Sequence, residues 1–155
     1  MIKKIAYSFL ASLPVLLFAF SSGPPIKRTG AAVDGGMNCS VCHTNLGPAN
    51  SDPAGSVSID ASAYTPGVAQ SIKVTVMHPQ AMRWGFQITA RLAGDETKQA
   101  GTFAPNDVVR VRCDSSPAHD TPCNGALEFP EHKDAPFTAP GAGFTFQVDW
   151  TPPAG

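Results

Sequence analysis

The sequence predicts an all-β protein built as an antiparallel sandwich of short strands. Its 155 residues include 14 Gly and 15 Pro but only 15% charged residues, which is typical of a chain with many turns. Apolar and polar residues alternate strictly over residues 72–76, 86–92 and 144–150, and each of these segments therefore predicts a half-buried strand. Helical periodicity is absent beyond the first 20 residues, so these observations together exclude a helical bundle.

The other predicted strands are shorter. Val57 and Ile59 alternate with serines ahead of the turn Tyr-Thr-Pro-Gly at 64–67, and Gly94-Asp95 turns the chain after the strand over 86–92. Further candidates are residues 99–103, 108–112 and 127–129. Six to eight short strands separated by turns favour a sandwich.

The N-terminus predicts export. Lys3 and Lys4 precede an almost entirely apolar run from Ile5 to Phe20, and small residues follow. This is the plan of a secretory signal peptide over residues 1–21, with an uncleaved membrane anchor as the alternative. We therefore expect a periplasmic or extracellular protein, associated with a membrane only if residues 1–21 are retained.

The remaining 134 residues divide into a linker and attachment segment over 22–55 and a single sandwich domain over 56–155. Removing the two signal lysines changes the formal net charge of the chain from -1 to -3. The sequence has no basic run, so its composition argues against a nucleic-acid partner.

The segment Cys39-Ser40-Val41-Cys42-His43 has the Cys-x-x-Cys-His pattern of a c-type haem attachment site. The thiols of Cys39 and Cys42 can form thioethers to the haem vinyl groups, and His43 can then ligate the iron on the proximal side. Covalent attachment of haem in bacteria takes place outside the cytoplasm, in agreement with the signal peptide. The sequence therefore predicts one covalent haem c.

The second pair of cysteines, Cys113 and Cys123, encloses a polar excursion. In an oxidising compartment we expect a disulfide between them, which would contribute roughly 2–3 kcal/mol for a loop of this size. The alternative is a metal site that uses Cys113, His119 and Cys123.

Residues 56–153 resemble the bacterial branch of the reelin-like (reeler) domains. The matching pieces are Tyr64-Thr65-Pro66-Gly67, the strand over 72–76, Arg83-Trp84-Gly85-Phe86-Gln87-Ile88-Thr89-Ala90, Ala100-Gly101-Thr102-Phe103, Glu131-His132 and Trp150-Thr151-Pro152-Pro153. The resemblance implies an immunoglobulin-like β-sandwich, and bacterial members often carry a Cys-x-x-Cys-His segment just before the first strand.

Two departures from the family matter. The segment from Cys113 to Cys123 resembles an insertion into the sequence pattern of the family. Such domains also usually continue into one further strand beyond the point where this sequence stops. The resemblance therefore implies either that the sequence is truncated or that a neighbouring strand comes from elsewhere and fills an unpaired sheet edge. Such an edge invites strand addition by a second chain, in a homo- or hetero-oligomer.

An electron-transfer haem needs a second axial ligand. His132 is the first choice, because it matches the Glu-His position of the resembling family; the alternative is a surface histidine paired with Glu131. The other candidates are His78, Met77, Met82, Met37 and His119. The alternative for the methionines is ordinary packing, and His119 is expected to be solvated in the disulfide loop.

Arg83 and Trp84 also have two interpretations. Arg83 can neutralise a haem propionate and Trp84 can pack on the porphyrin edge. Alternatively, Trp84 is a buried sandwich residue and Arg83 lies on the rim, which is the simpler interpretation.

The leading hypothesis is an exported monohaem c-type cytochrome that passes single electrons between redox proteins, alone or as a subunit of a larger redox assembly. The sequence contains no Ser/His/Asp arrangement, paired-carboxylate spacing or Gly-rich phosphate loop that would indicate a hydrolase. The alternatives are a secreted binding or adhesion module, in which the Cys-x-x-Cys-His segment is a disulfide or zinc site, and a haem enzyme with an open distal face.

Overall fold

The computed structural model describes residues 22–44, 47–61 and 63–154, so the predicted signal peptide or anchor over 1–21 lies outside the described residues. The described chain forms two short 3-10 helices, η1 (Ala32–Asp34) and η2 (Cys39–Val41), and nine strands. The strands are β1 (Ser56–Asp60), β2 (Gln70–Met77), β3 (Arg91–Leu92), β4 (Asp95–Gln99), β5 (Thr102–Ala104), β6 (Val109–Cys113), β7 (His119–Asp120), β8 (Glu128–His132) and β9 (Phe144–Thr151). None of the described helices is long and apolar enough to cross a membrane.

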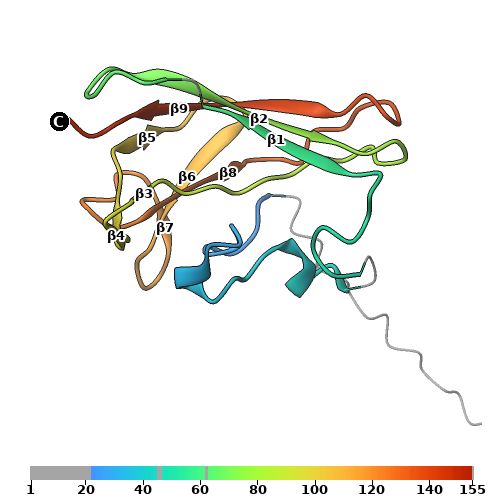
Figure 1. Cartoon of the computed structure of the whole chain (residues 1–155), viewed down its shortest axis with the longest axis horizontal. Coiled ribbons are helices and arrows are strands. Elements are labelled where there is room, and N and C mark those ends of the chain that lie inside the picture. The colour runs from blue at the N-terminus through green and yellow to red at the C-terminus, as the bar shows by residue number, and fades with distance from the viewer. Residues whose placement is uncertain (1–21, 45–46, 62, 155) are drawn as a thin grey trace, which may run out of the picture.

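The strands form antiparallel sheets (Figure 1). One sheet has the order β1-β2-β9-β5, a second has the order β7-β6-β8, and β3 and β4 form a separate hairpin. The predicted all-β fold is confirmed. The immunoglobulin-like arrangement that the family resemblance implies stays a prediction.

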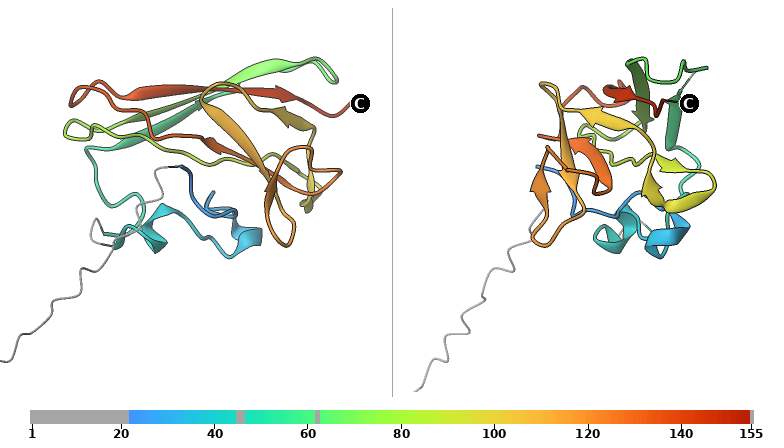
Figure 2. Two further views of the ribbon diagram at one scale, coloured as in Figure 1. Left: turned by 180° about the vertical axis from the view of Figure 1, so that it is seen from behind. Right: turned by 90° about the vertical axis from the view of Figure 1, so that its left-hand side faces the viewer.

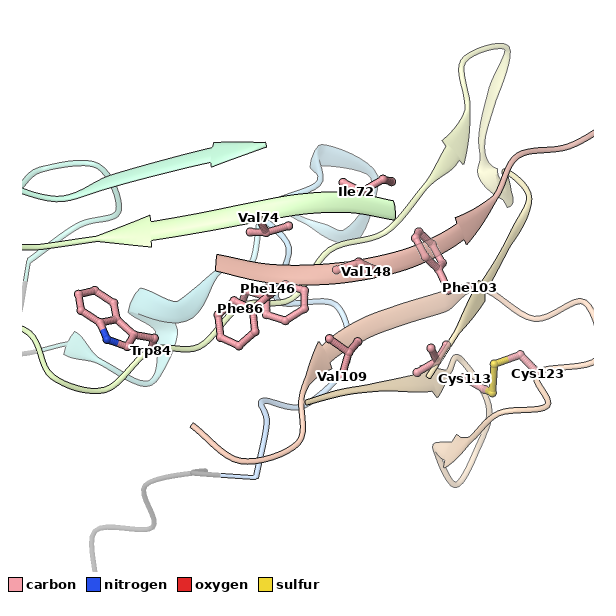
Figure 3. Close-up of a cluster of buried hydrophobic side chains, with 11 residues drawn as sticks. Ile72, Val74, Trp84, Phe86, Phe103, Val109, Cys113, Cys123, Phe146 and Val148 are labelled. Carbon is pink, nitrogen blue, oxygen red and sulfur yellow. A yellow bond between two sulfur atoms is a disulfide. The ribbon is translucent and has the colours of Figure 1, made fainter. Parts of the chain in front are cut away.

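The hydrophobic core lies between the β2–β9 pair and β6. The alternating strands supply Ile72 and Val74 from β2, Phe146 and Val148 from β9, and Val109 and Val111 from β6. The cluster extends from Trp84 at one end to the Cys113–Cys123 disulfide at the other (Figure 3). Burial of each large apolar side chain contributes roughly 1.5–3 kcal/mol, so this interdigitated layer holds the two sheets together.

The predicted strand over 86–92 is largely wrong. Strand pairing in this segment is limited to an isolated bridge between Gln87 and Glu131 and to β3 at its end. Nevertheless the segment runs beside β8, because the Ile88 N–H donates to the Pro130 carbonyl at 3.0 Å. Phe86 points into the core as the alternation predicts, but Gln87 is also buried. The alternation therefore wrongly predicts that the face bearing Gln87 is exposed to solvent. The N-terminal segment covers that face.

The shorter predicted strands are shifted rather than absent. The candidate over 99–103 is divided between the end of β4 and β5, and the candidate over 108–112 becomes β6. The weakest candidate, 127–129, becomes β8, whose five residues are all buried. A strand covered on both faces shows no alternation, so the sequence pattern underestimates it.

The Cys113–Cys123 disulfide is confirmed. It closes the excursion that contains β7, and His119 is exposed there as expected. The alternative metal site at this excursion is wrong, because the two sulfur atoms that it requires are bonded to each other.

The last strand is not at a sheet edge. β9 pairs with β2 on one side and with β5 on the other, so its backbone is covered. The edges of this sheet are β1 and β5.

Candidate cofactor pocket

The N-terminal segment over 22–55 lies along one side of the strands, as both views of Figure 2 show. Two ion pairs and one hydrogen bond join it to the strands. Asp34 pairs with Arg91 at 2.5 Å, Lys27 pairs with Asp114 at 2.7 Å, and Asp52 shares a hydrogen bond with His78 at 3.0 Å. The side chains of the first pair are only 6% and 8% exposed, so this pair is shielded from solvent.

The Gln87 side chain provides a further clamp. Its Oε1 accepts the Arg28 N–H at 2.6 Å, and its Nε2 donates to the Pro25 carbonyl at 3.1 Å. The same Nε2 lies 2.7 Å from Glu131 Oε2, and Arg110 Nη2 lies 2.7 Å from Glu131 Oε1. Burial raises the pKa of the Glu131 carboxyl, whereas the hydrogen bonds from Gln87 and Arg110 act in the opposite direction. This buried network fixes the backbone at Pro25 and Arg28, in the part of the N-terminal segment that precedes η1 and the Cys-x-x-Cys-His segment.

The Cys-x-x-Cys-His segment forms the turn of η2. Asn38 caps it, since its Oδ1 accepts the Ser40 N–H at 2.9 Å, and the His43 N–H donates to the Cys39 carbonyl at 3.0 Å. Residues three apart in a 3-10 turn lie one above the other. Cys39 and Cys42 therefore share a side of the turn, and both are unbonded and exposed to solvent.

The thiol of Cys39 is nevertheless surrounded by enough protein to change its acidity. Desolvation raises the pKa of the Cys39 thiol, and the neighbouring Cys42 acts in the same direction. A backbone hydrogen bond and the positive charge of Arg28 act in the opposite direction. Arg28 is thus electrostatically coupled to the first cysteine of the segment.

A pocket of about 470 Å³ lies between the N-terminal segment and the sandwich. Its lining includes all three reactive residues of the segment, Cys39, Cys42 and His43, together with the histidine of β8, His132. Its apolar lining residues are Pro24, Pro25, Pro48, Ala49, Trp84, Phe86 and Ala135, and its cationic ones are Arg28 and Arg83. No Asp or Glu lines this pocket among the described residues. It is therefore a mainly apolar pocket with a positive electrostatic bias.

His132 lies at the end of β8 and is only 6% exposed. Its Nδ1 faces the backbone of Phe86, 3.1 Å from the N–H group and 3.3 Å from the carbonyl oxygen, which fixes the orientation of the ring. Gly85 packs directly on the imidazole, since a Cβ at that position would lie 2.6 Å from His132 Cε1. The alternative of a surface location for His132 is wrong, because His132 and Glu131 are both buried. Glu131 binds Gln87 and Arg110.

Trp84 is a packing residue and a pocket residue at once. It is 3% exposed, and its Nε1 donates to Thr138 Oγ1 at 2.7 Å, as a buried indole requires. Arg83 is on the exposed rim, with its guanidinium carbon 5.5 Å from the centroid of the Phe137 ring. The two interpretations of these residues are therefore compatible with each other.

The other candidate iron ligands lie outside the pocket lining. His78 binds Asp52, and the Met77 and Met82 side chains are largely exposed. Met37 lies in the N-terminal segment, where its Sδ is 3.3 Å from Arg28 Nη1. His119 is in the disulfide-closed excursion.

The pocket residues that sequence reasoning missed include Arg28, Gly85 and Phe86. Gly85 and Phe86 belong to the Arg-Trp-Gly-Phe piece of the family resemblance, which was a usable signal. Arg28 carried none, because it lies in an irregular segment and reaches the pocket only through the tertiary fold.

Comparison with protein-family models, with curated proteins and with solved structures found no match to this chain. Within the described residues, no group of three or more His, Cys, Asp and Glu side chains is arranged to hold a metal ion.

The lining chemistry fits a haem. The volume falls in the range of roughly 300–1,000 Å³ that is usual for ligand and cofactor pockets. A porphyrin needs apolar walls, its carboxylates need cations, and covalent attachment needs two thiols close in sequence. The pocket offers each of these, and the Cβ-free surface of Gly85 lets the His132 ring lie at its wall.

Proposed function

We propose that this protein is an exported c-type cytochrome that carries one covalent haem and transfers single electrons between redox proteins. The observation that carries the proposal is the composition of one pocket. Cys39, Cys42 and His43 come from the N-terminal segment and His132 comes from β8, and all four line the same apolar, acid-free cavity. The segment and the histidine of β8 are about 90 positions apart in sequence, so only the fold unites them.

When bound, the haem supplies an iron that alternates between the ferrous and ferric states, which is the chemistry of a single-electron carrier. Cys39 and Cys42 would anchor the group, and His43 and, through Nε2, His132 would ligate its iron. In the structure Nδ1 accepts the Phe86 N–H at 3.1 Å. Ligation through Nε2 requires the proton on Nδ1, so that contact would be replaced by donation from Nδ1 to the Phe86 carbonyl, 3.3 Å away.

The remaining pocket residues tune and shield the site. Arg28 and Arg83 are suited to pair with carboxylates of the bound group, because a guanidinium offers several N–H donors in a planar arrangement. Trp84 and Phe86 exclude water from the wall that adjoins the core. Two histidine ligands give a lower reduction potential than one histidine and one methionine.

Electron transfer is favoured over catalysis by the place of His132. A haem enzyme such as a peroxidase needs an open distal face for its substrate, whereas here a buried imidazole lies at the wall of the pocket. A side chain in that position blocks access and keeps the ligand set the same in both redox states.

The test is expression of the exported chain together with a cytochrome c maturation system. We expect a haem-stained band on a denaturing gel and a sharp α-band in the reduced absorption spectrum. The variant Cys39→Ser/Cys42→Ser should lose the stain. A colourless, unstained wild-type protein would end the cytochrome proposal, and zinc in place of iron would favour the binding module.

The distal ligand is tested separately with His132→Ala and the matched control His119→Ala, which changes an exposed histidine of β7. We expect His132→Ala to keep covalent haem but to shift the spectrum from low-spin to high-spin, and His119→Ala to leave the spectrum unchanged. A low-spin spectrum in His132→Ala would contradict the assignment of His132 while leaving the cytochrome proposal intact.

A further inference from the structure

Strand β1 has an unpaired outer edge. It pairs with β2 along its whole length, from Ser56 opposite Met77 to Asp60 opposite Lys73, without a register shift. It is terminal in the order β1-β2-β9-β5. Within the described part of the chain, the backbone of β1 makes no hydrogen bond beyond that ladder. Its other side therefore presents strand N–H and C=O groups to solvent.

The other edges of the two larger sheets are protected. The outer side of β8 is covered by the segment at Gln87 and Ile88, through the Gln87–Glu131 bridge and the hydrogen bond from the Ile88 N–H to the Pro130 carbonyl. At the opposite edge of the same sheet, β5 has only three residues, and the buried Glu128 carboxylate accepts its Phe103 N–H at 2.6 Å. In the second sheet, the edge strand β7 has two residues and lies inside the disulfide-closed excursion. Short strands and capped backbone groups prevent pairing with another chain. β1 has five regular residues and contains no Lys, Pro or bulge.

The side chains of β1 are better suited to contact with a protein partner than to contact with water. Val57 lies opposite Val76 and Ile59 lies opposite Val74, so both share the face that bears the core side chains of β2. They are nevertheless 67% and 58% exposed. These two apolar side chains therefore lie on the core side of the sheet but are mostly uncovered. A further strand added at this edge could cover them with its own side chains.

The pattern of β1 is complementary to a second copy of β1. In an antiparallel pair with a two-fold axis at Ser58, Ser58 lies opposite itself, Val57 lies opposite Ile59, and Ser56 lies opposite Asp60. Apolar residues then meet apolar residues on one face, and the single charge of the strand meets a serine rather than its own copy. Symmetric, self-complementary contacts of this kind are the usual basis of homodimers.

We propose that the protein forms a two-fold dimer in which β1 of each copy joins the two four-stranded sheets into one continuous sheet. The proposal is independent of the haem, because none of the residues of β1 lines the cofactor pocket.

The first test is the molar mass of the purified exported protein, measured by light scattering and sedimentation velocity over a range of concentrations. We expect a mass of two chains for the wild type and of one chain for Ile59→Lys. The matched control is Val108→Lys, which places the same charge on an exposed valine outside β1. A wild type that stays monomeric, or a dimer that Ile59→Lys leaves intact, would overturn the proposal.

The second test fixes the register. Residues directly opposite in antiparallel strands have Cα atoms about 4.5–5.5 Å apart, within the range that a disulfide spans. Ser58→Cys should therefore form a covalent dimer on a non-reducing gel. Ser56→Cys, in the same background of cysteines, should not, because it faces Asp60 of the other copy. Equal cross-linking of the two variants would contradict the two-fold pairing at Ser58.

Discussion

Gly85→Ala is a sharp test of the pocket, because it displaces His132 without removing it. A Cβ at position 85 would lie 2.6 Å from Cε1, 3.0 Å from Nδ1 and 3.1 Å from Nε2 of the imidazole. Ordinary van der Waals contact begins at 3.4 Å, so relief of the closest contact requires the ring to move by about 0.8 Å. A shift of that size is enough to break the hydrogen bond that the Phe86 N–H donates to Nδ1, whose length is 3.1 Å.

The expected result has two parts. Overpacking against the buried His132 ring costs about 1–3 kcal/mol of the free energy of unfolding, to be measured by urea denaturation with tryptophan fluorescence. In the haem-loaded protein, withdrawal of the imidazole should produce a high-spin component in the absorption spectrum. The matched control is Gly94→Ala, where no atom lies within 4 Å of the added Cβ and the spectrum and stability should be unchanged.

The two readouts separate the two claims in the reasoning. Equal stability of Gly85→Ala and Gly94→Ala would refute the packing of His132 against Gly85. A destabilised Gly85→Ala protein with an unchanged low-spin spectrum would uphold the packing and refute His132 as the distal ligand.

Three further predictions concern charge and the disulfide. Arg28→Met removes the positive charge that lowers the pKa of the Cys39 thiol, so alkylation of Cys39 by iodoacetamide at neutral pH should slow in the haem-free protein; an unchanged rate would contradict the coupling. Cys113→Ala/Cys123→Ala removes a disulfide across a sequence separation of 10 and should lower the free energy of unfolding by about 2–3 kcal/mol, which urea denaturation at fixed pH would detect. Burial raises the pKa of Glu128, so the folded state binds this proton more tightly than the unfolded state, and stability is lost as pH rises through the folded pKa. Glu128→Gln should therefore reduce the fall in unfolding free energy as pH rises above the ordinary glutamate pKa of 4.5, and an unchanged pH dependence would contradict the argument.

The sequence predicts well the strands that have one buried face and one exposed face. Residues 72–76 and 144–150 alternate because β2 and β9 face the core on one side and solvent on the other, and both strands are confirmed. The same rule fails where a second layer covers the outer face. The alternation predicts an exposed Gln87, but the N-terminal segment covers it and uses its side-chain amide. A local pattern records whether a residue is polar, not which distant backbone it binds.

The candidate site also has one part that the sequence predicts and another part that it does not. The sequence by itself determined the Cys-x-x-Cys-His segment and the pairing of Cys113 with Cys123, since both depend on short spacings along the chain. Only the tertiary structure decided that His132 lines the pocket of Cys39 and Cys42 while His78 and the candidate methionines do not. The physical reason is that the Gln87 side chain joins the N-terminal segment at Pro25 and Arg28 to Glu131 of β8. These partners are tens of residues apart in sequence, and no local pattern contains that information.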